Sequence, residues 1–519
     1  MSRTKNASRN IIFGIVLKIF QLFVPFLIRT LMIYFMGVEY LGLNSLFVSI
    51  LQVLNLTELG VGSAMIYSMY KPIAENDKPT ICALMNMYKK YYRVIGIIIA
   101  VLGIAVIPFL PYLVKGDIPS DLNLYVLYLL NLSVTVISYW LFAYKNSLLT
   151  AHQRADITSK ITLAVNLIMY AIQAIIICIF KNYYAYLITT FFAQIIINLT
   201  TAFLVDKKYP EYKAHGDLPK EEVKKINQRI KDLITSKIGA VIVNSVDTLV
   251  ISAFLGLTTL AIYQNYYFIF ISINSLISII FTSCTAGIGN SIIVETKEKN
   301  YNDFKKFTLL ICWIAGFCAC CLLCLYQPFM KIWVGEDLML EDLAVICFVI
   351  YFFTYEINQL FNSYKDAAGI WHQDRFRPLV TALSNLVMNL IFVQFMGVYG
   401  VLLSTVLSTI LVGMPWLISN IFTTIFEKKN VKNYLLFIFK YVILTLISCV
   451  ICYFVCSLFN IDMYLTLVIN LLICIFVSNI IYFICSFKTK EFSECCKLIN
   501  RITKGKIKFL KYFIKEEDV

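Results

Sequence analysis

The sequence predicts an all-α integral membrane protein with fourteen transmembrane helices, arranged as two pseudo-symmetric six-helix lobes and two C-terminal helices. Composition, apolar run length and an internal repeat predict this fold class. The 519 residues are 60% hydrophobic and 15% charged, with a mean hydropathy of +0.77. Apolar runs of about 20 residues recur along the chain, and each can cross a hydrocarbon core of roughly 30 Å. Backbone groups in lipid must be satisfied within the segment, so these runs are expected to be helices.

The chain contains an internal repeat, because four short motifs of the first half return in the second half at almost one offset. The shift is 219 residues for three motifs and 220 for the fourth. The pairs are Phe35-Met-Gly37 with Phe254-Leu-Gly256, Val114-Lys-Gly116 with Trp333-Val-Gly335, Tyr144-Lys145 and His152-Gln153 with Tyr364-Lys365 and His372-Gln373, and Asn166-Leu-Ile-Met169 with Asn385-Leu-Val-Met388. Two similar membrane-embedded halves are typical of alternating-access transporters.

The repeat and the apolar runs together place the fourteen spans. They are expected at 11–36, 41–70, 91–114, 122–145, 157–180, 183–205, 228–256, 259–290, 306–334, 341–364, 376–396, 398–426, 434–458 and 463–487. The first run is too long for the apolar core of a cleaved signal peptide, so we expect it to be retained. The expected domains are an N-lobe at 1–205 (spans 1–6), a cytoplasmic linker at 206–227, a C-lobe at 228–427 (spans 7–12), spans 13 and 14 at 428–487, and a basic amphipathic cytoplasmic tail at 488–519.

Within the linker, Asp217 is expected to cap a short helix whose first turn contains Pro219. The tail alternates cations with apolar residues such as Phe492 and Ile502. It is expected to lie as a helix on an anionic inner leaflet, although a plain solvated tail is the alternative.

Loop charges predict the orientation. Loops after even-numbered spans carry most of the cations, including the cluster from Lys207 to Lys237, whereas loops after odd-numbered spans are mainly acidic. By the positive-inside rule, both termini face the cytoplasm of a bacterial cell, and the protein is a multi-pass protein of the cytoplasmic membrane. The net charge of +14 is therefore mostly a topology signal. No nucleic-acid partner is expected, because the cations are scattered over many short loops.

Most of the sixteen cysteines lie inside apolar runs. Cys321 and Cys324 form a CxxC motif beside Cys318 and Cys320 in the middle of the expected ninth span. We interpret them as small apolar packing residues, because no companion ligands at the same depth are visible in the sequence. No metal and no cofactor are therefore predicted. Cys495 and Cys496 lie in the basic tail, and we do not expect them to be acylated.

Ionisable side chains inside expected spans are the main functional signal, because charge at mid-bilayer costs on the order of 3 kcal/mol and persists only where it faces protein or water. Lys18 and Arg29 lie on the first span, about three helical turns apart and thus on one face. Shifting by 219 residues places Lys18 on Lys237 and Arg29 on Thr248, beside Asp247. The first and seventh spans are therefore expected to carry polar groups at similar depths.

We interpret these cations as lining a central cavity, where they would attract an anion such as a pyrophosphate. The candidate substrate-binding residues are Arg29, Lys18 and Lys237, and the candidate gating or ion-coupling residues are Asp247, Glu58 and Glu356. The alternative is that Arg29 with Asp247, or Lys18 with Glu58, forms an ion pair that only neutralises charge. The two interpretations are compatible, since a pair that breaks during transport can act as a gate.

The sequence lacks the common motifs for nucleotide binding and metal-dependent hydrolysis. The sequence contains no Walker A loop, no Gly-rich dinucleotide fingerprint and no HExxH, so an ATP-driven pump on this chain is excluded. The repeated Tyr-Lys and His-Gln elements are expected at the cytoplasmic ends of spans four and ten, as loop and helix-end motifs and not as a metal site. The protein is not expected to be an enzyme, because a membrane-embedded glycosyltransferase would need a large outer loop, and the expected outer loops are a few residues long.

The stretch from Arg9 to Glu75 resembles the N-terminus of polysaccharide-biosynthesis flippases of Gram-positive bacteria. The resemblance is carried by Phe35-Met-Gly-Val-Glu-Tyr-Leu-Gly-Leu-Asn-Ser45 and Leu54-Asn-Leu-Thr-Glu-Leu-Gly-Val-Gly-Ser63. These Wzx-type transporters belong to the superfamily that also contains MATE drug exporters and MurJ lipid II flippases. The resemblance implies two lobes around a cavity, with spans thirteen and fourteen flanking a lipid-side groove. It also implies that undecaprenyl-pyrophosphate-linked oligosaccharide is flipped from the inner to the outer leaflet for capsule or cell-surface polysaccharide assembly.

Two departures bear on the alternatives, a MurJ-like lipid II flippase and an ion-coupled multidrug antiporter. MATE exporters usually carry a carboxylate on the first span, where this chain has Lys18 and Arg29. MurJ carries an Arg-Asp pair there, whereas Arg29 is followed by Thr30. The expected partners are the lipid-linked oligosaccharide, membrane lipids, and a polysaccharide polymerase and glycosyltransferases, with the chain acting as a monomer.

Overall fold

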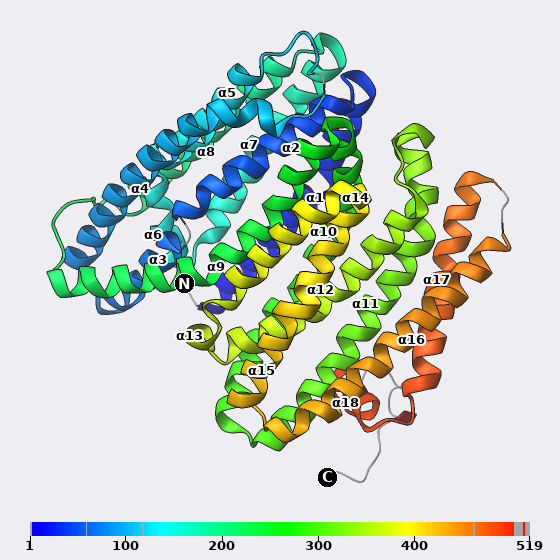
Figure 1. Cartoon of the computed structure of the whole chain (residues 1–519). Coiled ribbons are helices and arrows are strands. Elements are labelled where there is room, and N and C mark those ends of the chain that lie inside the picture. Colours follow the sequence, from blue (N-terminus) through cyan, green and yellow to red (C-terminus); the bar gives the residue numbers. More distant parts are fainter. Residues whose placement is uncertain (1–2, 59, 117, 460–461, 503–511, 514–519) are drawn as a thin grey trace. The chain divides into compact units, whose positions relative to one another are not determined.

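The computed structural model describes residues 3–58, 60–116, 118–459, 462–502 and 512–513, and in this part of the chain all regular structure is helical (Figure 1). The all-α fold class is therefore confirmed. Contacts divide the chain into two compact units, Met1–Gln264 and Asn265–Val519, and each is described by itself. The finer sequence-based domain boundaries stay a prediction.

The first unit contains nine α-helices and the start of a tenth, joined by short 3₁₀ or π segments. They are α1 (Arg3–Phe35), α2 (Val38–Leu54), η1 (Asn55–Glu58), α3 (Val61–Glu75), α4 (Lys78–Val106), η2 (Ile107–Leu113), α5 (Leu124–Trp140), η3 (Ala143–Lys145), α6 (Asn146–Ala151), α7 (Ala155–Ile175), η4 (Ile176–Phe180), α8 (Tyr183–Lys208), α9 (Lys220–Leu255) and α10 (Leu257–Val294), which continues into the second unit.

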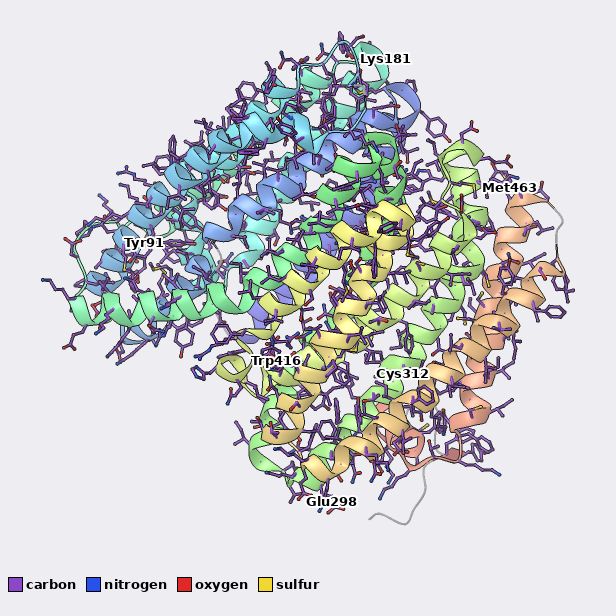
Figure 2. All side chains as sticks on the ribbon, viewed as in Figure 1. Tyr91, Lys181, Glu298, Cys312, Trp416 and Met463 are labelled. Carbon is purple, nitrogen blue, oxygen red and sulfur yellow. The ribbon has the colours of Figure 1, made fainter. Side chains whose placement is uncertain are left out.

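The second unit holds most of α10 and all later elements. They are α11 (Lys297–Val334), η5 (Glu336–Leu338), α12 (Asp342–Ala367), α13 (Trp371–Asp374), α14 (Arg377–Ser408), η6 (Thr409–Gly413), α15 (Met414–Thr424), η7 (Lys428–Asn430), α16 (Val431–Ser457), α17 (Met463–Ser486) and α18 (Lys490–Ile502). Glu298 and Met463 lie at opposite ends of this unit with Cys312 between them, and Tyr91 and Lys181 lie at opposite ends of the first unit (Figure 2).

Several helices start at a side chain that accepts a hydrogen bond from the first turn. The carboxylate of Asp77 accepts from the backbone N–H of Thr80 at 3.1 Å. The same role is played by Asn123 for α5, Asn182 for α8, Thr296 for α11 and Asp462 for α17. Each cap satisfies donors that the helix itself cannot pair. The expectation that Asp217 caps a helix is wrong, because α9 begins after Pro219 and Asp217 pairs with Lys90 at 2.7 Å.

Ten helices of the described chain are long and apolar enough to cross a membrane, or eleven if the bent segment from Leu124 to Ala151 counts as one span. The expected number of fourteen stays a prediction. Three features explain the difference. The second expected span is interrupted by η1 and Gly60, the seventh is continuous with the linker helix in α9, and the eleventh and twelfth fall in one helical stretch, Trp371–Thr424, broken at Gly397.

The internal repeat is visible in the backbone conformation of its glycines. Gly37, Gly116, Gly256 and Gly335 all have positive φ, at 124°, 95°, 92° and 85°. Such φ values are accessible to glycine without the steric cost that other residues meet. The N–H of Gly37 donates to the carbonyl of Met32 at 3.0 Å, and that of Gly256 donates to Ile251, the repeat equivalent of Met32, at 3.1 Å. The equivalent motifs therefore end equivalent helices in the same way.

The linker is attached to the first unit. Besides the Lys90–Asp217 pair, the amide of Asn86 donates to the carbonyl of Gly216 at 2.7 Å. Further along, the Tyr91 hydroxyl donates to Asn227 on α9 at 2.6 Å. Helix α4 therefore holds both the linker and the start of α9.

In the second unit, α11 is the central helix and packs against α12, α16, α17 and α18. Small residues permit the close approach of α17, since a Cβ atom at Gly316 would overlap the Tyr482 ring. The Tyr482 hydroxyl donates to the carbonyl of Cys312 at 2.9 Å and lies 2.6 Å from the Thr445 hydroxyl. One tyrosine thus joins α11, α16 and α17.

The start of the tail, helix α18, also packs within the second unit. Phe492 and Cys495 on α18 are buried, the Phe492 ring stacks on Trp313 with centroids 5.9 Å apart, and Glu491 pairs with Lys305 at 3.0 Å. The described part of the tail therefore docks on α11. Its expected membrane-surface position and the remainder of the tail, mostly outside the described residues, stay predictions.

We predict that Gly316→Ala destabilises the protein by about 1–3 kcal/mol, because the added methyl group overpacks the α11–α17 contact. Thermal unfolding of the purified protein in detergent measures the effect. Gly287→Ala is the matched control, because a Cβ at that helical glycine meets nothing within 4 Å. Equal melting temperatures for the two variants would contradict the assigned packing.

Candidate functional site

Arg29 lies on α1, half-buried against the tyrosines of the first unit. Its guanidinium interacts electrostatically with Tyr186 on α8. The Tyr186 ring stacks on Tyr183 with centroids 5.6 Å apart, and Tyr183 in turn packs edge-on against Tyr40 at 5.4 Å. Arg29 therefore borders a cluster of three tyrosine rings.

The two other candidate cations differ from Arg29 in environment. Lys18, on the same helix, is exposed. The backbone of Lys237 belongs to α9, but its side chain lies outside the described residues. The expected grouping of the three cations around one cavity stays a prediction.

Glu58 lies in η1 and is held by tyrosines. Its carboxylate accepts a hydrogen bond from the Tyr92 hydroxyl at 3.0 Å, and the Tyr92 hydroxyl accepts one from Tyr88 at 2.7 Å. The Tyr139 ring packs edge-on against Tyr92 at 5.2 Å, and its hydroxyl donates to Asn55 at 3.2 Å. Three hydroxyl groups thus gather near one carboxyl group, an arrangement that can stabilise a charged carboxylate or relay a proton.

Asp247 lies on α9 and is only 5% exposed. The next residue, Thr248, accepts a hydrogen bond from the Gln264 amide at 2.9 Å. One turn further, the Ser252 hydroxyl donates to the carbonyl of Leu113 at 2.6 Å, and Lys115 donates to the carbonyl of Phe254 at 2.6 Å. Hydrogen bonds therefore hold this part of α9 against the end of η2 and the loop that follows it. The buried Asp247 lies in the same part of the helix.

Glu356 is the deepest carboxyl group of the second unit. It is 0% exposed on α12, and neither of its oxygens has a hydrogen-bond partner among the residues that the structure describes. Its sequence neighbour Tyr355 accepts a hydrogen bond from Gln359 at 3.0 Å, and Asn362 follows on the same helix. A buried carboxyl group without a partner is costly when ionised, so this position suits a bound cation or proton.

A long apolar groove runs along the second unit between α12 and α16. It consists of two adjoining cavities of about 790 Å³ and about 830 Å³, which share Val349, Ile350, Leu446 and Cys449. The first cavity continues to η6 and α15, and the exposed Lys428 lines it. The second continues to α11 and α17. We call the two together the α12–α16 groove; its lining suits a hydrocarbon chain.

The repeated Tyr-Lys and His-Gln elements have structural contacts. Lys145 pairs with Asp206 at 2.5 Å, and its repeat equivalent Lys365 pairs with the buried Asp374 at 3.7 Å. His152 lies half-buried in the loop after α6, and burial lowers its pKa, so the neutral ring is favoured. These contacts fit the helix-end interpretation.

Sequence analysis identified Glu58 but missed its partners. Tyr88 and Tyr92 are four residues apart on α4 and share a helix face. This spacing indicates that the two hydroxyl groups can serve one site. Tyr139 lies on α5, and nothing in the sequence ties it to η1. The groove was anticipated only through the family resemblance.

Comparison with known proteins assigns the class. The search of solved structures matches the lipid II flippase MurJ in an inward closed conformation, with a TM-score of 0.66 and 18% identity over 91% of this chain and 98% of that chain. An inward-facing multidrug resistance MATE family transporter matches with a TM-score of 0.61 and 13% identity, covering 81% of this chain and 99% of the other. The chain is therefore a multi-pass membrane protein with the fold of the MurJ and MATE transporters.

The family model for polysaccharide biosynthesis proteins matches residues 7–285, more than half of the chain. The protein belongs to this family, as the resemblance of its N-terminal stretch predicts. The search of curated proteins finds no match.

We predict that Tyr92→Phe lowers the free energy of unfolding by about 1–3 kcal/mol, because Glu58 loses a donor while Tyr88 loses an acceptor. Thermal unfolding in detergent measures the change. Tyr125→Phe is the control, since Tyr125 is exposed on α5. If both variants melt together, Tyr92 does not hold Glu58 in the folded protein.

Proposed function

We propose that this protein flips undecaprenyl-pyrophosphate-linked oligosaccharide from the inner to the outer leaflet by alternating access, for capsule or cell-surface polysaccharide assembly. The observation that carries the proposal is the match of residues 7–285 to the polysaccharide biosynthesis protein family. A transporter fold in a polysaccharide pathway needs a substrate that is made on one side of the membrane and used on the other. Lipid-linked oligosaccharides have this property.

The α12–α16 groove supports the lipid part of the proposal. A polyprenyl chain is too long and apolar to enter a polar cavity at low cost, because each CH₂ group transferred out of an apolar medium costs about 0.8 kcal/mol. The groove offers apolar side chains from both helices, such as Val349 on α12 and Leu446 on α16. The chain can therefore remain in an apolar environment while the head group moves.

The head group is the part that cations would bind. A pyrophosphate accepts several charge-assisted hydrogen bonds, and an arginine offers donors in a planar fork that fits phosphate oxygens. In this proposal Arg29, Lys18 and Lys237 bind the pyrophosphate. Drug export would require an acidic first span instead, so the antiporter alternative has less support. A MurJ-like lipid II flippase shares the same lipid and pyrophosphate and differs in its sugars.

Coupling requires groups that bind or release a cation during the cycle. Asp247, Glu58 and Glu356 are the candidates, and all three carboxyl groups lie on expected spans. Glu356 is fully buried and Asp247 nearly so, whereas Glu58 is held by Tyr92. In the proposed cycle the protein acts as a monomer in the bacterial cytoplasmic membrane with both termini cytoplasmic. A polysaccharide polymerase and glycosyltransferases act before and after it.

Deletion of the gene tests the proposal. The expected result is loss of surface polysaccharide and accumulation of lipid-linked repeat units that a membrane-impermeant reagent cannot reach from outside. Normal surface polysaccharide in the deletion strain would reject the assignment. Accumulation of lipid II instead would select the MurJ-like alternative.

We predict that Arg29→Gln lowers polysaccharide export about 10- to 100-fold in a complemented deletion strain, because one charge-assisted contact is worth about 1.5–3 kcal/mol. Export is measured as surface polysaccharide per unit of inserted protein. Lys90→Gln is the control, because Lys90 is exposed and pairs with the linker residue Asp217. Full export by the Arg29 variant would remove this residue from the mechanism.

A second prediction concerns the α12–α16 groove. Val442→Trp should reduce export at least several-fold, since the indole would fill the groove at α16. Ile443→Trp, one residue away and 42% exposed outside the groove lining, should export at the wild-type rate. The same complementation assay measures both. Equal export by the two variants would argue against lipid-chain binding in the groove.

A further inference from the structure

Three helices of the second unit direct cysteines toward one another. On α16 the cysteines are spaced three or four residues apart, and on α11 Cys320 and Cys321 each lie three or four residues from Cys324, so most of them share one face of their helix. These helices and α17 pack against each other pairwise. The residues are Cys320, Cys321 and Cys324 on α11, Cys449, Cys452 and Cys456 on α16, and Cys474 on α17.

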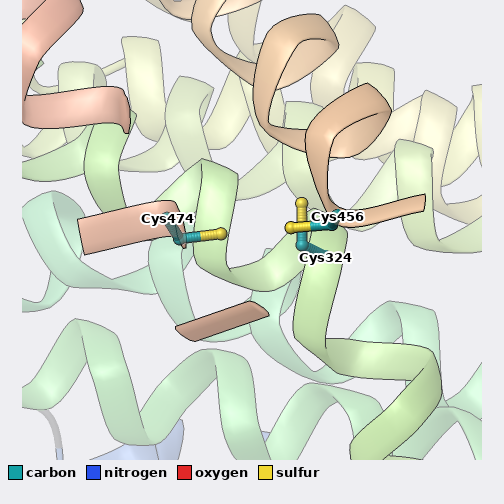
Figure 3. Close-up of side chains that lie close together, drawn as sticks. All are labelled: Cys324, Cys456 and Cys474. Carbon is teal, nitrogen blue, oxygen red and sulfur yellow. The ribbon is translucent and has the colours of Figure 1, made fainter. Parts of the chain in front are cut away.

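The Sγ atoms of Cys324, Cys456 and Cys474 all lie within 4.8 Å of one another, and all three side chains are buried. Figure 3 shows the sulfur of Cys474 pointing toward the sulfurs of Cys324 and Cys456. The Cys474 thiol donates to the carbonyl of Cys320 at 3.5 Å, and the Cys456 thiol donates to the carbonyl of Asn470 at 4.0 Å. The expectation that the CxxC motif has no companion ligands at its depth is therefore wrong.

Helix packing is the other role open to these cysteines. Free cysteines often serve as small apolar residues. The same helix already supplies small residues within three turns before Cys324, at Ala315, Gly316 and Ala319, and all of these are buried. Tight helix contact therefore does not require thiols, whereas the meeting of three thiols from three helices matches the needs of a metal ligand set.

The donor set selects the kind of metal ion. The trio consists of sulfur only, with no carboxylate or imidazole in the group. Thiolates favour soft ions such as Cu(I) and Zn(II) over Mg²⁺ or Ca²⁺. Structural zinc sites almost always use four ligands, whereas three sulfurs suit a trigonal ion. With metal–sulfur bonds of about 2.3 Å, a trigonal site places its sulfurs about 4 Å apart, within the separation found here.

The site also has an access path. The cavity of about 830 Å³ in the α12–α16 groove is lined by Cys324 and Cys456, and it extends to Gln327 and Asp342 at the start of α12. The Gln327 amide donates to Asp342 at 2.9 Å. An ion carried by a small thiol or chelator could therefore reach the sulfurs from that end, in keeping with the requirement that a metal site has an approach.

We propose that Cys324, Cys456 and Cys474 form a binding site for Cu(I). Binding replaces the three thiol protons with one Cu(I) ion, so three protons are released and no oxidation or reduction occurs. The resulting group carries a charge of −2. The site joins α11, α16 and α17. Two of its three cysteines line the α12–α16 groove, but the argument for Cu(I) binding does not rest on the proposed transport function.

The test uses the full-length protein in detergent under anaerobic conditions. Cu(I) is supplied in the presence of bicinchoninate as a competing chelator, and the metal content and sulfur coordination are measured by elemental analysis and X-ray absorption. The expected result is one Cu(I) per chain with sulfur ligands only. The C324S/C456S/C474S variant should lose this ion, and C178S/C284S/C485S, which replaces cysteines outside the trio, should keep it.

Size-exclusion profiles of both triple variants report on folding. If the first triple variant aggregates, the single variant C474S is used, with an expected loss of at least tenfold in Cu(I) affinity. Two results would overturn the proposal: wild-type protein that takes up no Cu(I) against the chelator, or a trio variant that binds it as wild type does. Exclusive binding of Zn(II) by four sulfurs would overturn the choice of ion.

Discussion

The cost of placing a charged or polar group in an apolar membrane is the constraint on which this structure depends. Several such groups in the described chain are held by ion pairs near helix ends. Asp156, 0% exposed, pairs with Arg154 at 2.9 Å and lies 3.5 Å from Lys160. Arg377 donates to both carboxylate oxygens of Asp374, at 2.6 and 2.7 Å. Such contacts fix helix ends within each unit, and groups without them, such as Glu356, are the candidates for function.

The same constraint explains why so much of the fold was predictable. Apolar runs of membrane length are one-dimensional signals, so the helical class follows from them directly. The repeat was equally readable, because a positive φ at Gly37 and Gly256 requires the same residue type in both halves. The number of spans was harder to predict. Gly60 and Gly397 interrupt helices inside apolar runs, and the hydropathy of the run does not mark such a break.

Features that depend on which helices meet could not be predicted. Glu58 was identified as a costly charge, yet its contacts with Tyr92 on α4 and the nearby Tyr139 on α5 depend on tertiary packing. The cysteines show the same difference. Spacing reveals that Cys321 and Cys324 share a face, but only the packing of α16 and α17 on α11 brings Cys456 and Cys474 beside them. A single sequence therefore shows which residues share a helix face, but it does not show which other helix packs against that face.

The central claim, movement of a lipid-linked oligosaccharide across the membrane, is tested most directly by reconstitution. The purified protein is placed in vesicles that contain undecaprenyl-pyrophosphate-linked oligosaccharide, and a membrane-impermeant glycosidase is added outside. Without transport, only the outer-leaflet half of the substrate is cleaved. We predict that cleavage proceeds beyond this half at a rate set by the amount of protein. Cleavage that stops at half in sealed vesicles containing folded protein, with or without an ion gradient, would contradict the account.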